Sequence, residues 1–209
     1  MIRHAALLAI FAVTAAPLYA TTYTLEPDYT QGVFRWNHLG FSSPAAQFAQ
    51  GQGTLEFDPS DPTRSSVTVT IPLDTLNTGV PGLDDHFRSG DFFDTAKYPV
   101  ATFKSSQVEK GSMKNQFKVK GDLTLHGTTR PVTLDVTMVR IGTNPRTNLP
   151  TVGFDGTTIL KRSDFGMGKY VPQVSDEIEL RVISQAVQAA AYAAYLKSQE
   201  AAEKATKKK

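Results

Sequence analysis

The sequence predicts an all-β fold, most simply an eight-stranded antiparallel barrel. About eight runs alternate apolar and polar residues, their connections are mostly short, and their apolar faces are rich in aromatic side chains. A sandwich is the alternative with the same strand number. We favour the barrel because the strands are long and their apolar faces are unusually aromatic. Closure would remove the sheet edges, and about eight strands leave an interior that can hold one small ligand.

The clearest element is the stretch 115–139. Phe117 and Leu125 fall on the same face of one run with other apolar residues, while lysine, aspartate and threonine fall on the opposite face. The alternation resumes after the polar break 126–129. Two such runs joined by a glycine-containing connection predict a β-hairpin with one wet face. Gly121, in mid-strand, is expected to mark a bend or bulge.

The remaining elements are weaker versions of the same pattern. Before the hairpin we expect strands at 22–25, 33–39, 53–57, 65–71 and 100–108. We also expect a helical turn at 44–50 that presents Phe48, a Pro- and Asp-rich turn at 58–63, and a short helix at 83–89. After the hairpin we expect a polar loop at 140–149, a strand at 151–160, a turn at 163–166 and a last strand at 177–183.

The two ends of the chain differ from this body. Residues 1–20 have a basic start, an apolar run and a small final residue, which indicates a secretory signal peptide cut after Ala20 and hence a periplasmic protein. The body, 21–184, is expected to be one domain. The Ala- and Lys-rich segment 185–209 predicts a helical tail, either a solvated extension or a basic tether to anionic membrane lipid.

Composition narrows the classes of function. The chain has 209 residues, no cysteine and a formal net charge of +2. Without cysteine there is neither a disulfide nor a lipoprotein anchor, so packing and the sheet must supply the stability. A nearly neutral balance of charge gives no argument for nucleic acid as a partner. Oligomeric state stays open, with a homodimer as one alternative.

The candidate chemical groups are few. Asp84, His86 and Asp91 lie close in sequence, but their spacing matches no strong zinc motif, so we expect capping and hydrogen bonding there and no metal. His38 shares the parity of Phe34 and Trp36, and we expect a satisfied histidine at the barrel rim in preference to a head-group contact. His126 is expected in the hairpin turn. Asp164 and Asp176 could pair with a basic group such as Arg162 at one end of the barrel. We assign no catalytic residue, because no nucleophile elbow or phosphate-binding loop is present.

Several segments together resemble the YceI-like family of bacterial secreted proteins. They are FRWNHLGFS at 34–42, LDDHFRSGDFFDTAKYPVATF at 83–103, GDLTLHGTT at 121–129, PVTL at 131–134, SDFG at 163–166 and SDEI at 175–178. The resemblance spans roughly 22–184. Leu83 stands where the family often has Arg, so the role of that Arg is either absent here or filled by Arg88.

The resemblance implies a lipocalin-like barrel whose apolar tunnel binds a polyisoprenoid, an isoprenoid quinone or another long-chain amphiphilic lipid, with no other cofactor. Enclosing such a ligand gains about 25 cal/mol per Å² of apolar area. The residues that we expect to contact it are Phe34, Trp36, His38, Phe41, Phe48, Phe57, Phe92, Phe93, Phe103, Phe117, Leu123, Leu125, Phe154 and Phe165.

Two other functions compete with a lipid carrier. The first is a periplasmic enzyme that acts on a lipid-like substrate and uses His38, His86 or His126 with nearby carboxylates. The second is an outer-membrane barrel, which ranks far behind. That barrel would need an apolar lipid-facing band on every strand, whereas charged residues such as Lys118 and Glu179 occupy the face opposite the apolar one.

Overall fold

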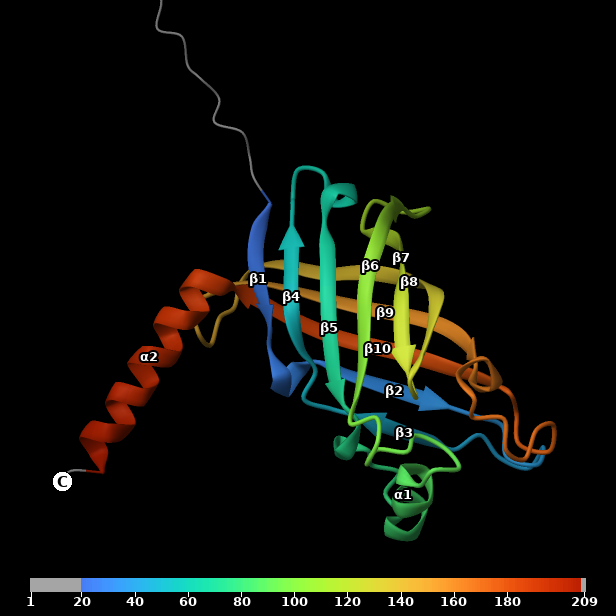
Figure 1. Cartoon of the computed structure of the whole chain (residues 1–209). Helices are drawn as coiled ribbons and strands as arrows, with labels where there is room; N and C mark the ends of the chain where they lie inside the picture. The colour runs from blue at the N-terminus through green and yellow to red at the C-terminus, as the bar shows by residue number, and fades with distance from the viewer. Residues whose placement is uncertain (1–19, 208–209) are drawn as a thin grey trace, which may run out of the picture.

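The computed structural model describes residues 20–207 (Figure 1). The predicted signal peptide lies outside the described residues, apart from Ala20. Ten strand segments form one continuous antiparallel sheet in the order β1-β4-β5-β6-β7-β8-β9-β10-β2-β3. They are β1 (Thr21–Leu25), β2 (Gln31–Arg35), β3 (Ala45–Phe48), β4 (Gln52–Phe57), β5 (Ser66–Pro72), β6 (Val100–Lys110), β7 (Gln116–Leu125), β8 (Thr128–Thr143), β9 (Pro150–Lys161) and β10 (Glu177–Gln188).

The sheet closes on itself at β10. The far end of β10 pairs with β1, Gln188 opposite Tyr23, while its first half pairs with β2, Leu180 opposite Phe34. A short 3-10 turn, η1 (Pro27–Tyr29), separates β1 from β2. The strands β1 and β4 to β10 therefore form a closed ring of eight, with β2 and β3 added along β10. The predicted eight-stranded antiparallel barrel is confirmed.

In Figure 1 the strands β4, β5 and β6 stand upright, and β9, β10, β2 and β3 run across behind them. The long strand β8 is paired on one side with β7 and on the other with β9, so it joins the two orientations. A register shift between Met138 and Arg140 lies in the middle of that strand. The extra residue of a bulge bends its strand, which lets one sheet turn the corner of a barrel.

The hairpin 115–139 forms as predicted. Its connection is the two-residue turn His126-Gly127, both with positive φ (50° and 71°), the geometry that matches the twist of two antiparallel strands. Opposite Gly121 the partner strand β6 carries a bulge between Ser105 and Gln107. A Cβ at Gly121 would lie 2.6 Å from the ring of Phe103, so only glycine permits this close approach.

Two helices flank the barrel. The short helix α1 (Pro81–Arg88) lies below β3 in Figure 1, as predicted for 83–89, and the helix α2 (Ala189–Thr206) extends away from the barrel on the far side of β1. Arg88 donates to the carbonyl of Leu76 at 2.6 Å, which ties α1 to the preceding 3-10 turn η3 (Leu73–Thr75). In residues 20–207, no helix is both long enough and apolar enough to cross a membrane.

Several predicted boundaries are wrong. The expected helical turn at 44–50 is the strand β3, whose residues alternate between exposed and buried and pair with β2, Phe48 opposite Gly32. The expected strand 33–39 ends at Arg35, and residues 37–42 form a separate turn. Tertiary pairing decided each case, because a four-residue strand carries too little alternation to be read alone.

Two further segments extend the sheet, although the sequence predicts a loop for one and a helical tail for the other. The strand β8 continues to Thr143 into the expected loop 140–149, where Ile141 pairs with Val152. The last strand continues to Gln188, five residues past its predicted end, because it gains the neighbours β9 and β1. The helical tail therefore begins at Ala189 and not at residue 185.

Candidate functional site

The barrel encloses an apolar cavity of about 520 Å³. Typical ligand cavities measure about 300–1,000 Å³ and have mostly apolar walls with a few polar groups. Its wall receives side chains from most of the strands and from α1. Arg162 is its only residue with a formal charge at neutral pH. The remaining polar residues of the wall are Thr30, His38, Ser65, Ser66, His86, Thr102, Thr158, Tyr170 and Ser184.

The structure brings thirteen of the fourteen predicted contact residues to this wall. They are Phe34, Trp36, His38, Phe48, Phe57, Phe92, Phe93, Phe103, Phe117, Leu123, Leu125, Phe154 and Phe165. Strand parity explains most of them, since alternate residues of a strand share one face. Their contact with a ligand stays a prediction.

Phe41 is the exception, and its predicted place in the wall is wrong. Its side chain is 92% exposed and lies outside the cavity. Phe41 lies beyond the expected strand 33–39, so no alternation predicted its direction, and the chain has left the sheet after Arg35 and turns back at residues 39 and 40. Phe41 thus projects from a turn.

Aromatic rings form one end of the cavity. The ring of Phe34 stacks on Phe48 at 5.5 Å, and Phe48 meets the edge of Phe93 at 5.0 Å. Trp36 contacts Phe87 of α1 in the same way at 5.2 Å. Such edge-to-face and offset contacts fix ring positions, so this part of the wall has a defined shape.

The prediction missed the contribution of α1. Leu83, His86 and Phe87 all line the cavity. They are spaced i, i+3 and i+4, the pattern of one helix face, which was available in the sequence. Aliphatic wall residues were also missed, among them Val132, Leu134 and Val136. The alternation of the second run of the hairpin places these three side chains on its apolar face.

A hydrogen-bonded turn, residues 58–65, connects β4 to β5. We call this segment the turn end. Asp58 is 2% exposed, and its Oδ1 accepts from the hydroxyl (2.5 Å) and the backbone N–H (2.9 Å) of Ser60 and from the backbone N–H of Asp61 (3.1 Å). Its Oδ2 pairs with Arg64. The Ser60 hydroxyl bond, followed by the Asp61 N–H and Arg64, holds the pKa of Asp58 at about 2, against the opposing effect of desolvation.

Two loops lie side by side at another end of the barrel, away from the turn end. We call the segments 37–44 and 166–174 the loop end. The backbone N–H of Leu39 donates to the carbonyl of Gln173 at 3.1 Å, and that of Asn37 donates to the Ser175 hydroxyl at 2.9 Å. These bonds tie the turn after β2 to the connection between β9 and β10, as Figure 1 shows on its right-hand side.

Arg162 holds the second of these loops from inside. It begins the 3-10 turn η4 (Arg162–Phe165), and its guanidinium donates to four backbone carbonyls. The acceptors are Met167, Lys169 (2.7 Å), Val174 (3.0 Å) and Ser175 (2.8 Å). Burial lowers the pKa of Arg162.

The expected pairing of Arg162 with Asp164 or Asp176 is wrong. The Asp176 carboxylate instead accepts from the N–H (2.9 Å) and hydroxyl (2.7 Å) of Ser163, and Asp164 offers its backbone carbonyl to Arg130 (3.1 Å). Arg162 is therefore a structural clamp on the loop, because its donors are used by carbonyls.

Polar groups gather where the cavity meets the loop end. His38 and Tyr170 line the cavity there together with His86 of α1. The His86 ring lies 4.9 Å from Phe92 and 6.3 Å from Tyr170. Lys169 pairs with Asp91, a bond that raises the pKa of Lys169 and joins the loop 166–174 to the segment after α1.

The other predicted chemical groups have structural partners. Asp84 accepts from the N–H (2.7 Å) and hydroxyl (2.6 Å) of Thr78 in the loop before α1, although no side chain caps the helix. His126 lies in the hairpin turn, as predicted, with its Nδ1 2.9 Å from the carbonyl of Phe165. Within residues 20–207 no three His, Asp or Glu side chains come together in a way that could hold a metal ion.

A search of family models matches residues 23–186 to the YceI-like domain. Protein YceI of Escherichia coli O157:H7 is 37% identical over 155 residues, which are 74% of this chain and 80% of that protein.

Two solved structures share the fold. BcnA of Burkholderia cenocepacia superposes with a TM-score of 0.67 at 27% identity, over 75% of this chain and 95% of that chain. A domain of Saccharophagus degradans described as polyisoprenoid binding superposes with a TM-score of 0.60 at 15% identity, over 80% of this chain and 99% of that domain.

Proposed function

This chain belongs to the YceI-like domain family, and we propose that it is a carrier that encloses one long-chain amphiphilic lipid in its barrel. The ligand class we propose is an isoprenoid, either a polyisoprenoid or an isoprenoid quinone. Binding needs no further cofactor, because the ligand is held by burial of its chain. The Saccharophagus degradans domain, described as polyisoprenoid binding, supports this choice of ligand by analogy of fold.

The observation that carries the proposal is the composition of the cavity wall. About 520 Å³ is lined almost entirely by aromatic and aliphatic side chains. Arg162, its only formal charge, already donates to four carbonyls and has little left to offer a ligand. Such a wall gives water few partners but gains about 25 cal/mol for each Å² of hydrocarbon that it removes from solvent.

The polar head of the ligand belongs at the loop end. His38, His86 and Tyr170 are the polar side chains of the wall at that end, and each can donate or accept a hydrogen bond. The polar groups that the turn end and the first residue of β5 offer to the cavity are only hydroxyls, from Ser65 and Ser66. A quinone oxygen or a terminal alcohol would therefore find its partners beside α1.

We favour binding over catalysis. In residues 20–207 the ring of His126 is bonded to a carbonyl, and none of the three histidines forms an ion pair with a carboxylate. A general base needs such an orienting partner or a substrate proton within reach. The enzyme hypothesis thus has no specific observation in its favour.

The proposal also covers location and surroundings. We propose that the chain works in the periplasm after removal of residues 1–20, which would bring it near two membranes. In α2 the residues Lys197 and Lys204 are exposed, and a contact of this tail with anionic lipid would be weak and transient. A homodimer is compatible with the proposal and not required by it.

The direct test has two parts. Protein purified without detergent should release a long-chain lipid on organic extraction, detected by native mass spectrometry before and after extraction. Val136→Trp fills the middle of the cavity from β8, opposite Gly156, and should weaken uptake of a fluorescent isoprenoid at least about ten-fold. Thr133→Trp, on the outer face of the same strand, is the matched control and should bind normally.

Unchanged uptake by Val136→Trp would place the ligand elsewhere and contradict the proposal. Repeated purification of lipid-free protein that also fails to take up added isoprenoids would contradict it independently of any variant.

A further inference from the structure

The most exposed large apolar side chain of the described residues is at the loop end. Phe41 is 92% exposed, and Leu39 and Tyr170, on the same pair of loops, are each 50% exposed. Val171 follows Tyr170 and is also exposed. Single exposed apolar side chains are common on soluble proteins, but four of them on two adjoining loops are typical of an interaction site.

The turn that carries Phe41 is fixed by backbone bonds. The N–H of His38 donates to the carbonyl of Ser42 at 2.9 Å, and the N–H of Phe41 donates to the carbonyl of His38 at 3.0 Å. Leu39 and Gly40 have φ of 57° and 77°, the conformation of a tight two-residue hairpin turn. The turn therefore keeps the phenyl ring of Phe41 exposed to water. This exposure is unfavourable, and burial of the ring against a partner surface would remove it.

The exposed residues are continuous with the cavity. His38 and Pro44 of the first loop and Tyr170 and Val174 of the second line the cavity wall. His38 also forms isolated bridges to Ser42 and Val174, so backbone pairing joins the two loops. An apolar chain that leaves the cavity at this end would pass directly beside Leu39 and Phe41.

The charges at the loop end suit a lipid surface. Neither 37–44 nor 166–174 contains an acidic residue, and their one lysine, Lys169, is paired with Asp91 of the segment after α1, so that the pair has no net charge. Arg35 lies just ahead of the first loop and is exposed. Carboxylates would be repelled by anionic head groups and would be costly to bring into a bilayer, whereas the aromatic side chains of Phe41 and Tyr170 suit the interface.

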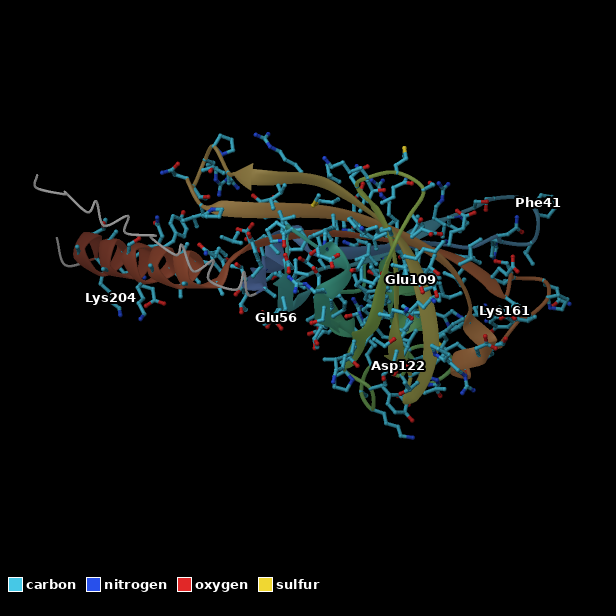
Figure 2. All side chains as sticks on the ribbon, turned by 90° about the horizontal axis from the view of Figure 1, so that it is seen from above. Phe41, Glu56, Glu109, Asp122, Lys161 and Lys204 are labelled. Atoms are coloured by element: carbon cyan, nitrogen blue, oxygen red, sulfur yellow. The ribbon has the colours of Figure 1, made fainter. Side chains whose placement is uncertain are left out.

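Figure 2 places Phe41 at one extremity of the molecule and Lys204, on α2, at the opposite extremity. A membrane that contacts the loop end therefore cannot be the one that the basic tail touches at the same time. Membrane contact through the tail and membrane contact through the loop end are therefore two different predictions, and an experiment can distinguish them.

We propose that the loop end docks on a phospholipid bilayer, with Phe41 as its main anchor, so that the cavity exchanges its lipid without exposing the chain to water. This inference rests on the proposed lipid-carrier function and adds the surface from which the ligand is loaded. A long apolar chain that crosses water loses the burial energy over its whole length, so contact between the cavity and a bilayer removes the largest barrier to exchange.

The test uses the absence of cysteine from the chain. Phe41→Cys in the full chain provides one site for an environment-sensitive dye, and Val139→Cys, on the outer face of β8 and 63% exposed, is the matched control. Vesicles of phosphatidylcholine alone and of equal parts phosphatidylcholine and phosphatidylglycerol are added to each. The dye at residue 41 should shift to shorter wavelength with both vesicles, and the dye at residue 139 should not.

A second measurement gives the size of the effect. Phe41→Ser should lower the vesicle partition coefficient about ten-fold or more, since it removes one phenyl ring from the bilayer. It should slow extraction of a fluorescent isoprenoid from vesicles to the same degree. Val139→Ser should change neither. Uptake of the same isoprenoid delivered from ethanol without vesicles should stay normal in both variants, because Phe41 is outside the cavity.

Three outcomes would overturn the docking proposal. The first is equal partitioning of Phe41→Ser and the parent chain. The second is binding that requires phosphatidylglycerol, disappears in high salt and ignores Phe41→Ser, which would assign the membrane contact to the basic tail. The third is a dye shift at residue 41 that grows with protein concentration without vesicles, because a second copy of the chain would then cover the surface. Failure of ethanol-delivered uptake in the parent chain would instead contradict the carrier function itself.

Discussion

The two ends of the barrel are built in opposite ways. The turn end centres on the buried carboxylate of Asp58, which collects donors from its own segment within seven residues. The loop end centres on the buried guanidinium of Arg162, which donates to carbonyls of the loop that follows it. One end is therefore a local turn around a carboxylate. The other joins two distant segments by backbone bonds, and a guanidinium holds one of the two.

This difference separates stability from exchange. A local turn can be fully satisfied without the rest of the fold, so the turn end has polar groups inside and no large apolar side chain outside. At the loop end the guanidinium of Arg162 is used to hold a loop, and the side chains of Leu39, Phe41 and Tyr170 are exposed to solvent. In the docking proposal the loop end is the exchanging end, because its exposed apolar side chains adjoin the cavity wall.

The largest expected effect tests the clamp at the loop end. Arg162→Lys keeps the charge but cannot reach four carbonyls, so we expect a loss of about 3 kcal/mol in the free energy of unfolding. Urea denaturation measures it, and hydrogen exchange should show the amides of 166–174 losing protection first. Arg181→Lys, an exposed arginine paired with Asp155, is the matched control and should cost little. A similar cost for both variants would contradict the clamp.

An intermediate effect is expected at the turn end. Asp58→Asn removes the charge that pairs with Arg64 and weakens the bonds from Ser60, so the thermal midpoint at neutral pH should fall by a few degrees. Lipid uptake should be unchanged, because the loop end is untouched. Asp135→Asn, in the exposed pair with Lys118, should leave the midpoint where it was.

The same residue predicts a pH dependence. The folded pKa of Asp58, about 2, lies below its ordinary value of 3.8, so its stabilisation is fully present above about pH 4 and is lost as the pH falls toward 2. The difference in midpoint between the parent chain and Asp58→Asn should shrink across that window, as measured by calorimetry. A constant difference down to pH 2 would show that the carboxylate charge is not what the turn uses.

The smallest effect on stability is expected from the exposed pair of Asp91 and Lys169 at the loop end. Asp91→Asn breaks the pair with Lys169, and since both side chains are partly exposed, the thermal midpoint should not change measurably. Release of a fluorescent isoprenoid should nevertheless become faster, because this pair joins the loop 166–174 to the segment after α1. Stopped-flow displacement checks this, and an unchanged release rate would remove Asp91 from any part in exchange.

Much of this architecture follows from period-2 alternation. The hairpin 115–139, with Gly121 opposite a bulge, follows from residues that are adjacent in sequence. The strand β3 does not, because four residues after Pro44 show too little alternation, and its place depends on pairing with Gly32. The place of Phe41 does not follow from alternation either, because this residue lies beyond the end of its strand.

The sequence by itself determined the class of fold, the inward faces of the long strands and the apolar character of the interior. Each of these is set by local alternation and by residue type. Tertiary structure decided that the inward rings leave a cavity, that Arg162 donates to carbonyls five to thirteen residues away and not to a carboxylate, and that Phe41 stands exposed at the surface. Volume, loop contact and exposure depend on which distant segments meet, and closure of the sheet around β10 decides that.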